Sequence, residues 1–481
     1  MREDIQKTKQ EKLENLKKAG METYPEKNER SMTNAEAVDK FDKITESIYL
    51  VGRVKSFRPM GNIAFAHIED GTGKIQIFLS KDNIEESKFN LFIDSVETGD
   101  FVEVTGTLFK TKSEEKTLNV ADWKMLSKNM RPIPTEHFGI KDEEEILRKR
   151  YLDLMMNQET RELFRKKRLF WHTVRHYLVK DGFLEVQTPT LEHIPGGAEA
   201  EPFVTHHNTL NQDFYLRISL ELPLKRLLIG GYEKVFEIGR VFRNEGIDRE
   251  HLQEYDSVEF YAAYWDMKKG MKFCEKMYKK IVKDITGGLV TEYADNKIDW
   301  SKKFAIVDYF KIFKKETGLD LKADLSAEAL KAKADELQIK YDPKYGKGRM
   351  IDLIYKKTVR QKLVQPCFLT GHPIEVSPLS KLDPKNPKKV LRFQIVAGSS
   401  ELCNAFSELN DPIDQKQRFL NQMKLREEGD KEAQMMDEDF VEALEYGMPP
   451  AFGFGMSERF FAFIMNKSVR ECVIFPPVKE K

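Results

Sequence analysis

Two segments of the chain alternate apolar and polar residues, and a charged stretch separates them. Residues 234–242 (KVFEIGRVF) and 257–264 (SVEFYAAY) both show a period of two, which predicts a pair of strands. Residues 243–251 (RNEGIDREH) are polar, so the pair predicts a hairpin with a long charged loop. The charged side chains that this hairpin would direct toward one spot are Arg243, Glu245, Arg249 and Glu259. Guanidinium groups beside carboxylates suit a ligand that carries both phosphate and a cation. On composition alone, an ordinary surface hairpin with ion pairs is the simpler interpretation.

Residues 47–127 show the same alternation in five short runs. These runs span residues 49–54, 63–68, 74–79, 101–106 and 117–120. Residues 82–96 predict a helix between the third and fourth strands. Five strands with a helix before the fourth is the order of an OB-fold barrel, and OB-folds bind single-stranded nucleic acid by stacking bases on exposed aromatic side chains.

The length of 481 residues predicts two or more domains. The predicted parts are an N-terminal helix within residues 1–30, an OB-fold domain at 45–128, a charged linker at 129–160 and a larger domain at 161–481 that carries a helical insertion at about 267–345.

Composition limits the compartment and the partners. The 79 basic residues balance the 79 acidic ones, so any surface for nucleic acid must be local. There is no apolar run long enough for a membrane span, and the charged N-terminus lacks the apolar core of a signal peptide. The four cysteines show no CxxC spacing, which argues against zinc and favours reduced thiols in the cytoplasm.

The charged loop and its surroundings carry sequence motifs. The run FRNEGID at 242–248 resembles motif 2 of the class II aminoacyl-tRNA synthetases, in the form that lysyl-tRNA synthetases carry. The loop residues that match this motif as well are His251, Glu254 and Tyr255. The helix–strand–proline unit at 161–189 is similar to motif 1, and FGFGMSER at 452–459 is similar to motif 3. The resemblance covers almost the whole chain and implies an α+β protein, in which a five-stranded OB-fold barrel precedes an antiparallel sheet flanked by helices.

The resemblance also implies an activity. It implies ATP-dependent activation of L-lysine to lysyl-adenylate, followed by transfer of the lysyl group to the 3′ end of tRNA(Lys). It implies Mg²⁺ as the cofactor and a cytoplasmic homodimer, formed through motif 1 and the run RKRYLDL at 148–154.

Positions that match the family's motifs supply the candidate site residues. For ATP binding, they are Arg243, Glu245, His251, Tyr255 and Arg459. The expected catalytic residues are Arg243 at the α-phosphate, Arg459 at the γ-phosphate and Glu401 as the magnesium ligand. For lysine binding, they are Gly197, Ala198, Glu221, Glu259, Tyr261, Asn404, Phe406 and Glu408. Phe65 and Gln76 are the candidates for binding the anticodon.

Charge supports lysine as the amino acid. Three carboxylates around one small ligand suit a molecule with two ammonium groups, so we expect Glu259 and Glu408 to bind the ε-ammonium and Glu221 the α-ammonium. Aspartate would add a further negative charge, and each repulsion at ~4 Å costs roughly 4 kcal/mol at an intermediate effective dielectric.

The sequence departs from the family's pattern at several positions. Gln394 stands where a second metal-binding carboxylate is usual, which predicts a weakened or lost magnesium site. Glu201 stands where Arg or Lys is usual, and motif 3 is one residue shorter but retains Arg459. Thr117 occupies the place of an anticodon-binding glutamate, with Glu115 nearby.

The same motifs would fit other proteins. An aspartyl- or asparaginyl-tRNA synthetase would share the OB-fold and the motifs, and a non-catalytic paralogue would share the fold. Phe65 would be a core residue on burial statistics alone.

Overall fold

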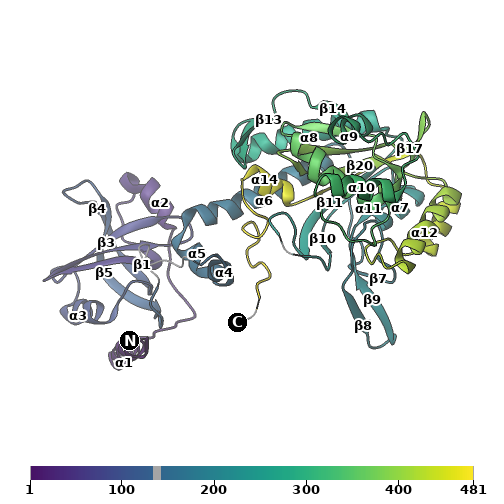
Figure 1. Cartoon of the computed structure of the whole chain (residues 1–481). Helices are drawn as coiled ribbons and strands as arrows, with labels where there is room; N and C mark the ends of the chain where they lie inside the picture. Colours follow the sequence, from purple (N-terminus) through teal and green to yellow (C-terminus); the bar gives the residue numbers. More distant parts are fainter. Residues whose placement is uncertain (1, 134–141, 247, 480–481) are drawn as a thin grey trace. The chain divides into compact units, whose positions relative to one another are not determined.

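The computed structural model describes residues 2–133, 142–246 and 248–479, with the backbone alone at residues 2–4. The chain forms two compact units, Met1–Asp142 and Glu143–Lys481 (Figure 1).

The first unit is a closed five-stranded barrel. Its strands are β1 (Ile48–Met60), β2 (Ile63–Glu69), β3 (Lys74–Ser80), β4 (Phe101–Lys110) and β5 (Lys116–Ser127), in the order β1-β2-β3-β5-β4. Helix α3 (Glu86–Ser95) stands before β4 and packs Phe89 and Phe92 into the barrel core. Along β2, alternate residues are buried, as expected for strands with one face toward a core. The OB-fold prediction is confirmed.

One carboxylate ties the N-terminal helix α1 (Arg2–Lys18) to this barrel. Glu97 accepts hydrogen bonds from Lys9 at 3.1 Å, from Lys12 at 3.0 Å and from Lys128 at 3.1 Å. Burial would raise the pKa of Glu97, but hydrogen bonds from Lys12, Lys128 and Lys9 outweigh it and lower the pKa to about 2. The short elements α2 (Asn34–Asp39) and η1 (Phe41–Lys43) complete this unit.

The second unit is built on a nine-stranded sheet. Its strand order is β14-β15-β18-β20-β21-β11-β10-β6, and β19 pairs with β18. The strands are β6 (Leu184–Glu185), β10 (Lys234–Phe242), β11 (Glu254–Ala263), β14 (Ala305–Asp308), β15 (Cys367–Thr370), β18 (Arg392–Ala397), β19 (Ser400–Glu401), β20 (Asn404–Ser407) and β21 (Ala451–Ser457). The central pairs are antiparallel, whereas the outer pairs β14–β15 and β6–β10 are parallel. The predicted α+β class is confirmed.

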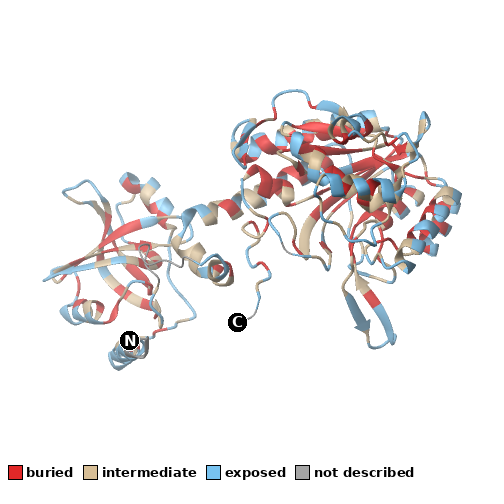
Figure 2. Ribbon diagram, in the orientation of Figure 1, coloured by how far each residue is buried: buried red, intermediate tan, exposed pale blue. Residues whose placement is uncertain are grey.

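Helices cover both faces of this sheet. Helices α6 (Gln158–Lys180), α8 (Met267–Thr286) and α14 (Arg459–Ile464) contribute to an apolar core with Val258, Phe260 and Ala262 of β11. Helices α7 (Glu221–Ile229), α12 (Pro412–Glu427) and α13 (Glu438–Glu445) share a second apolar cluster with Tyr261. Figure 2 shows the buried strands between helices whose outer sides are exposed. Successive β11 residues therefore face opposite layers.

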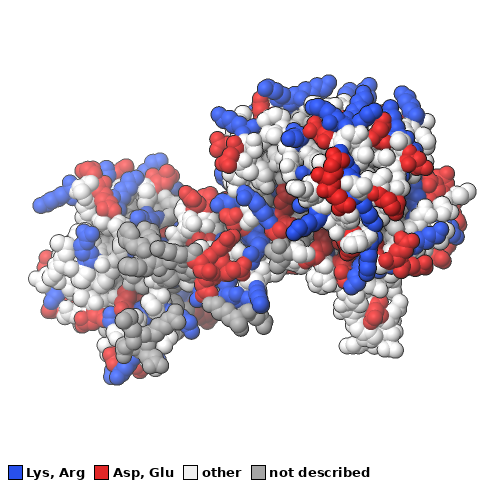
Figure 3. Space-filling model, viewed as in Figure 1, with Lys and Arg blue, Asp and Glu red and all other residues white. Residues whose placement is uncertain are grey.

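Smaller elements surround the sheet. They are α4 (Glu143–Arg148), α5 (Arg150–Met156), β7 (Leu191–Glu192), β8 (Val204–His207), β9 (Gln212–Leu216), β12 (Val290–Tyr293), β13 (Asn296–Asp299), α9 (Tyr309–Thr317), α10 (Ala327–Glu336), α11 (Lys347–Ile354), η3 (Tyr355–Val359), η4 (Arg360–Lys362), η5 (Ile374–Val376), β16 (Leu382–Asp383) and β17 (Asn386–Val390). The hairpin β8–β9 projects from this unit and shows few charged side chains on the face in view (Figure 3).

Two of the expected parts contain elements that the sequence did not predict. Within the linker expected at 129–160, residues 143–148 form α4 and residues 150–156 form α5, and both helices belong to the second unit. The expected helical insertion at 267–345 also contains β12, β13 and β14, and β14 is the outer strand of the main sheet. The N-terminal helix expected within residues 1–30 is α1; part of the linker prediction, 134–141, lies outside the described residues. Among the described helices, none is long and apolar enough to cross a membrane.

Replacing Glu97 with Gln should loosen α1. The amide cannot offset three ammonium groups, so hydrogen exchange of the α1 amides should become faster while that of β2 stays unchanged. Glu86→Gln, which removes an ion pair of an exposed carboxylate with Lys81, is the control and should leave α1 as it is. Because the pKa of Glu97 is lowered in the fold, its stabilising effect is full above pH ~4.5 and is lost as the pH falls toward 2. Unchanged exchange of α1 in Glu97→Gln would contradict this assignment.

Candidate active site

A cavity of about 1130 Å³ lies in the second unit and collects the motif residues. All six residues predicted to bind ATP or to act in catalysis line it: Arg243, Glu245, His251, Tyr255, Glu401 and Arg459. They come from the end of β10, the loop to β11, β11 itself, β19 and the start of α14. The sheet therefore brings together residues that are up to 216 positions apart in sequence, from 243 to 459.

Two motif arginines in this cavity, Arg243 and Arg459, form no ion pair with a carboxylate of the described residues. Arg243 Nε donates to the Ile218 carbonyl at 3.3 Å, and its guanidinium carbon lies 5.7 Å from the centre of the Tyr255 ring. Arg459 Nε donates to the Glu250 carbonyl at 3.2 Å, and its Nη1 donates to the Glu401 carbonyl at 3.4 Å. Within the described part of the chain, neither arginine forms an ion pair, so their charges are available to an anionic ligand.

The other predicted ATP residues lie in the same loop region. His251 Nδ1 lies 2.7 Å from an oxygen of Asp248, whose pKa is lowered because hydrogen bonds from this loop outweigh the effect of burial. Burial raises the pKa of the Tyr255 hydroxyl, and its ring is half-buried against Arg243. An aromatic face beside a guanidinium suits the stacking of a nucleobase.

The side-chain amide of Gln394 hydrogen-bonds one carboxylate oxygen of Glu401. Gln394 Nε2 donates to one carboxylate oxygen of Glu401 at 3.1 Å, and His372 Nε2 donates to Gln394 Oε1 at 3.0 Å. Burial and the charge of Arg392 lower the pKa of His372 well below its usual range, so this imidazole is neutral. The second Glu401 oxygen is buried and accepts no hydrogen bond from the described residues, and Arg360 forms an ion pair with it at 3.9 Å.

A second group of polar residues lies buried on the same face of the sheet. Cross-strand register places Gly453 of β21 between Phe406 and Tyr261, and Gly455 between Asn404 and Glu259. The glycines leave space between the side chains of β20 and β11. An added Cβ at Gly453 would lie 2.0 Å from Glu408 Oε1 and 2.5 Å from the Tyr261 ring.

Glu259 is the most fully hydrogen-bonded carboxylate of this group. It accepts hydrogen bonds from the Ser219 hydroxyl at 2.8 Å, the Leu220 amide at 2.9 Å and the Tyr261 hydroxyl at 2.9 Å. Burial nevertheless raises its pKa. Burial also raises the pKa of Glu221, to about 7, and the pKa of Glu408.

Sequence reasoning did not find Lys225, which lies between two of these carboxylates. Its fully buried ammonium donates to Glu221 Oε1 at 2.5 Å and forms an ion pair with Glu408. Burial opposes its charge, but Glu221 and Glu408 outweigh this effect and raise its pKa. The sequence could have indicated this ion pair, because Glu221 and Lys225 are four residues apart on a predicted helix and such residues are neighbours on the helix surface.

The predicted lysine-binding residues are only partly gathered. Glu221, Glu259, Tyr261, Phe406 and Glu408 are all buried and near one another, but none of the eight lines the cavity. Gly197 has φ +85°, and a Cβ there would lie 2.8 Å from Glu221 Cβ, so its loop packs closely on this group. Ala198 follows in that loop and is half-buried. Asn404 is exposed and accepts a hydrogen bond from Arg392 Nε at 2.7 Å.

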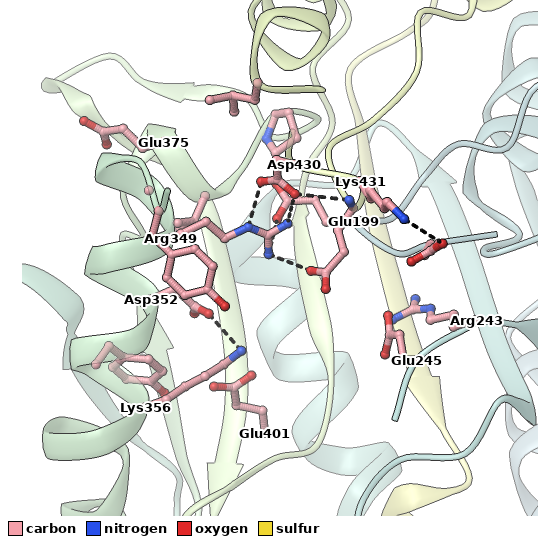
Figure 4. Close-up of a pocket in the computed structure, with 18 of the residues that line it drawn as sticks. Glu199, Arg243, Glu245, Arg349, Asp352, Lys356, Glu375, Glu401, Asp430 and Lys431 are labelled. Atoms are coloured by element: carbon pink, nitrogen blue, oxygen red, sulfur yellow. Dashed lines mark hydrogen bonds and ion pairs between the residues drawn. The ribbon is translucent and has the colours of Figure 1, made fainter. Parts of the chain in front are cut away.

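A network of ion pairs on the far side of the cavity was also missed. Arg349 of α11 contacts Glu199 at 3.6 Å, Asp430 at 3.0 Å and Glu432 at 2.9 Å (Figure 4). In the close-up, Arg243 and Glu245 lie across the cavity from these residues. The members come from segments far apart in the sequence, and no local pattern pairs them.

The first unit carries the predicted anticodon residues on its barrel. Phe65 is half-buried and its ring centre lies 4.9 Å from that of Phe78. Gln76 donates to Glu115 at 2.8 Å and accepts from the Thr117 hydroxyl at 2.8 Å. Thr117 is buried, so the carboxylate beside Gln76 comes from Glu115.

Comparisons with known proteins agree with this geometry. The model for tRNA synthetases class II (D, K and N) matches residues 142–479, and the model for the OB-fold nucleic acid binding domain matches residues 48–126. The chain belongs to the class II tRNA synthetases. It is 42% identical to a lysine–tRNA ligase of Halalkalibacterium halodurans over 99% of this chain and 97% of that protein. It is 42% identical to a lysine–tRNA ligase of Thermotoga maritima over 100% of this chain and 97% of that protein. It is 41% identical to a lysine–tRNA ligase of Roseiflexus castenholzii over 99% of each chain.

In this synthetase, Gly453→Ala should destabilise the second unit. The added methyl group overlaps Glu408 and Tyr261, and overpacking of this kind costs about 1–3 kcal/mol. Gly455→Ala is the matched control, because its Cβ would lie 3.5 Å from Glu259 Cγ, an ordinary contact. Urea unfolding followed by tryptophan fluorescence measures both variants, since Trp171, Trp265 and Trp300 lie in this unit. Equal unfolding free energies would show that Glu408 is not held against Gly453.

Proposed function

We propose that this class II synthetase activates L-lysine with ATP and transfers the lysyl group to the 3′ end of tRNA(Lys). The observation that carries the proposal is the pairing of two sites on one sheet. One is a cavity in which Arg243 and Arg459 have no ion pair among the described residues, and the other is a buried cluster of three carboxylates. The relatives named lysine–tRNA ligase support the choice of amino acid.

The chemistry needs no protein nucleophile. In the first step, the lysine carboxylate attacks the ATP α-phosphate, a P–O bond forms, and pyrophosphate leaves. In the second, a hydroxyl at the tRNA 3′ end attacks the lysyl carbonyl, and AMP leaves. Arg243 is proposed to neutralise the α-phosphate and Arg459 the γ-phosphate, because phosphoryl transfer depends on positioning and charge neutralisation. Tyr255, His251 and Glu245 are proposed to hold the adenosine part of ATP.

Three carboxylates select the amino acid. Lys225 contacts one oxygen each of Glu221 and Glu408, and Glu408 Oε1 accepts no hydrogen bond within the described part of the chain. We assign Glu259 and Glu408 to the ε-ammonium and Glu221 to the α-ammonium of lysine. Gly197 and Ala198 would cover the ligand, with Tyr261 and Phe406 at its side chain and Asn404 toward its carboxylate.

The residues at Glu401 fit a magnesium ion that is bound together with ATP. One buried oxygen of Glu401 accepts no hydrogen bond from any described residue, and Mg²⁺ in nucleotide sites is commonly held by one or two carboxylates plus substrate phosphates. Gln394 is neutral, so it cannot supply a second anionic ligand, and its amide donates to the other Glu401 oxygen. The ion would neutralise phosphate charge, while Gln394 and His372 orient Glu401.

Two further partners follow from the surfaces of the units. Phe65 and Gln76 of the barrel are proposed to bind the anticodon, with Glu115 beside Gln76. A homodimer is proposed through motif 1, which exposes the apolar side chains of Val179 and Leu184. Tyr232 before β10 and Tyr264 after β11 are exposed as well. The four cysteines are free and buried, in keeping with the cytoplasm as the proposed compartment.

Lysine-dependent ATP–pyrophosphate exchange tests the function. Lysine should support exchange, whereas aspartate and asparagine should not. Glu408→Gln keeps the shape but removes one charge, so it should raise the KM for lysine at least tenfold and change the KM for ATP less than twofold. Glu442→Gln on the exposed side of α13 is the control and should match the wild type. Exchange with aspartate, or an unchanged lysine KM in Glu408→Gln, would refute the assignment.

Phe65→Ala tests the anticodon site. Loss of one stacked base costs about 1–3 kcal/mol, so tRNA charging should fall about 5- to 150-fold in kcat/KM while pyrophosphate exchange stays unchanged. Phe57→Ala removes another half-buried barrel ring, which packs against Phe92 at 5.5 Å, and serves as the control. Equal loss of charging in both variants would mean that Phe65 acts only through barrel stability.

A further inference from the structure

Lys225 has no place in the two-step reaction, yet its ammonium lies within the proposed lysine pocket. It is fully buried, and it contacts Glu221 Oε1 and one oxygen of Glu408. The Phe406 and Phe440 rings flank it, with centres at 5.4 and 5.9 Å. A buried ammonium is strongly penalised unless it is paired, so this geometry holds the charge in one place.

The charged and titratable groups around Lys225 come from four elements. Glu221 lies on α7 with Lys225, Glu408 follows β20, and Glu259 and Tyr261 lie on β11. Arg392 of β18 acts on Glu221 from farther away. The three carboxylates and Lys225 together carry two net negative charges when all are ionised, which matches a substrate with two ammonium groups.

Before lysine binds, the ammonium groups of the substrate are absent, so the buried carboxylates need a counter-ion from the protein itself. Like charges in one buried site cannot all ionise without a counter-ion, because burial penalises each charged form and each carboxylate repels the others. Glu221 and Glu408 are the two carboxylates whose charge Lys225 directly offsets.

We propose that Lys225 is a specificity-determining positioning residue, a fixed internal counter-ion that favours the ionised forms of Glu221 and Glu408 and so increases the negative charge that the pocket presents to a diammonium amino acid. This inference rests on the proposed function, because it concerns the same pocket. Lys225 acts through the two carboxylates, and it stays in place when lysine binds.

Proton release on lysine binding tests the role of Lys225. Titration calorimetry of the full-length protein with L-lysine at pH 7, in phosphate and in Tris buffer, gives the number of protons exchanged. In Lys225→Met, a carboxylate that has lost its counter-ion takes up a proton and must release it when lysine binds. We therefore expect more protons, up to one additional proton, to be released per lysine than in the wild type.

The same substitution should change the pH dependence of affinity. A raised carboxyl pKa weakens lysine binding below that pKa and not above it. The ratio of the Kd of Lys225→Met to that of the wild type should be about ten or more at pH 7, and should fall below about three at pH 9. Lys225→Arg retains the charge, so its proton count and pH profile should follow the wild type even where its affinity is lower.

Controls separate the possible failures. ATP binding measured in the same way should exchange the same number of protons in every variant. If Lys225→Met fails to fold, Lys225→Met/Glu408→Gln removes one charge of each sign and should fold, with a proton count equal to that of Glu408→Gln alone. Equal proton release in Lys225→Met and the wild type, a ratio independent of pH, an additional proton in the double variant, or tighter lysine binding in Lys225→Met would each overturn the inference. A folded wild-type protein that does not bind lysine would instead refute the proposed function.

Discussion

The site depends on the two-residue period of β11, which is held in register between β10 and β21. Because successive side chains point to opposite faces, Val258 and Phe260 enter the apolar core while Glu259 and Tyr261 reach the polar face. A slip of one residue would place Glu259 in that core and expose the phenylalanine. The apolar packing that stabilises the sheet therefore also fixes a carboxylate of the pocket, and the register against Gly453 and Gly455 leaves room for it.

Local alternation predicted the strands well where one face is apolar. The predicted strand 234–242 coincides with β10, and all five barrel strands lie where alternation placed them. β11 begins at Glu254 rather than at 257, because its first residues are polar on both faces. Cross-strand contacts of Arg240 with Glu254 at 3.6 Å and with Asp256 at 3.0 Å take the place of apolar ones there. The four-residue strands β12 and β13 were missed, since short strands in a lysine-rich stretch show no clear period.

In the candidate site, the sequence identified the motif residues but not the residues that contact them. Motif residues such as Arg243, Glu401 and Arg459 could be named from sequence, and the sheet does gather them around one cavity. The hydrogen-bond and ion-pair partners of the site residues could not be named from sequence, because tertiary packing rather than sequence spacing decides which residues meet. Arg349 meets Asp430 across 81 residues. The amide between His372 and Glu401 likewise joins three segments, so the sequence showed a missing carboxylate at Gln394 but not the hydrogen bonds that replace it.

The two halves of the site handle charge in opposite ways, and this difference follows from exposure. In the cavity, Arg349 is already neutralised by three carboxylates, while Arg243 and Arg459 bond only to backbone carbonyls among the described residues. Water in an open cavity solvates these two charges, so they need no counter-ion before a phosphate binds. In the buried cluster no solvent is available, and unbalanced charge would be lost by protonation. An internal cation is therefore needed where the carboxylates are buried, and it is not needed where the arginines face the cavity.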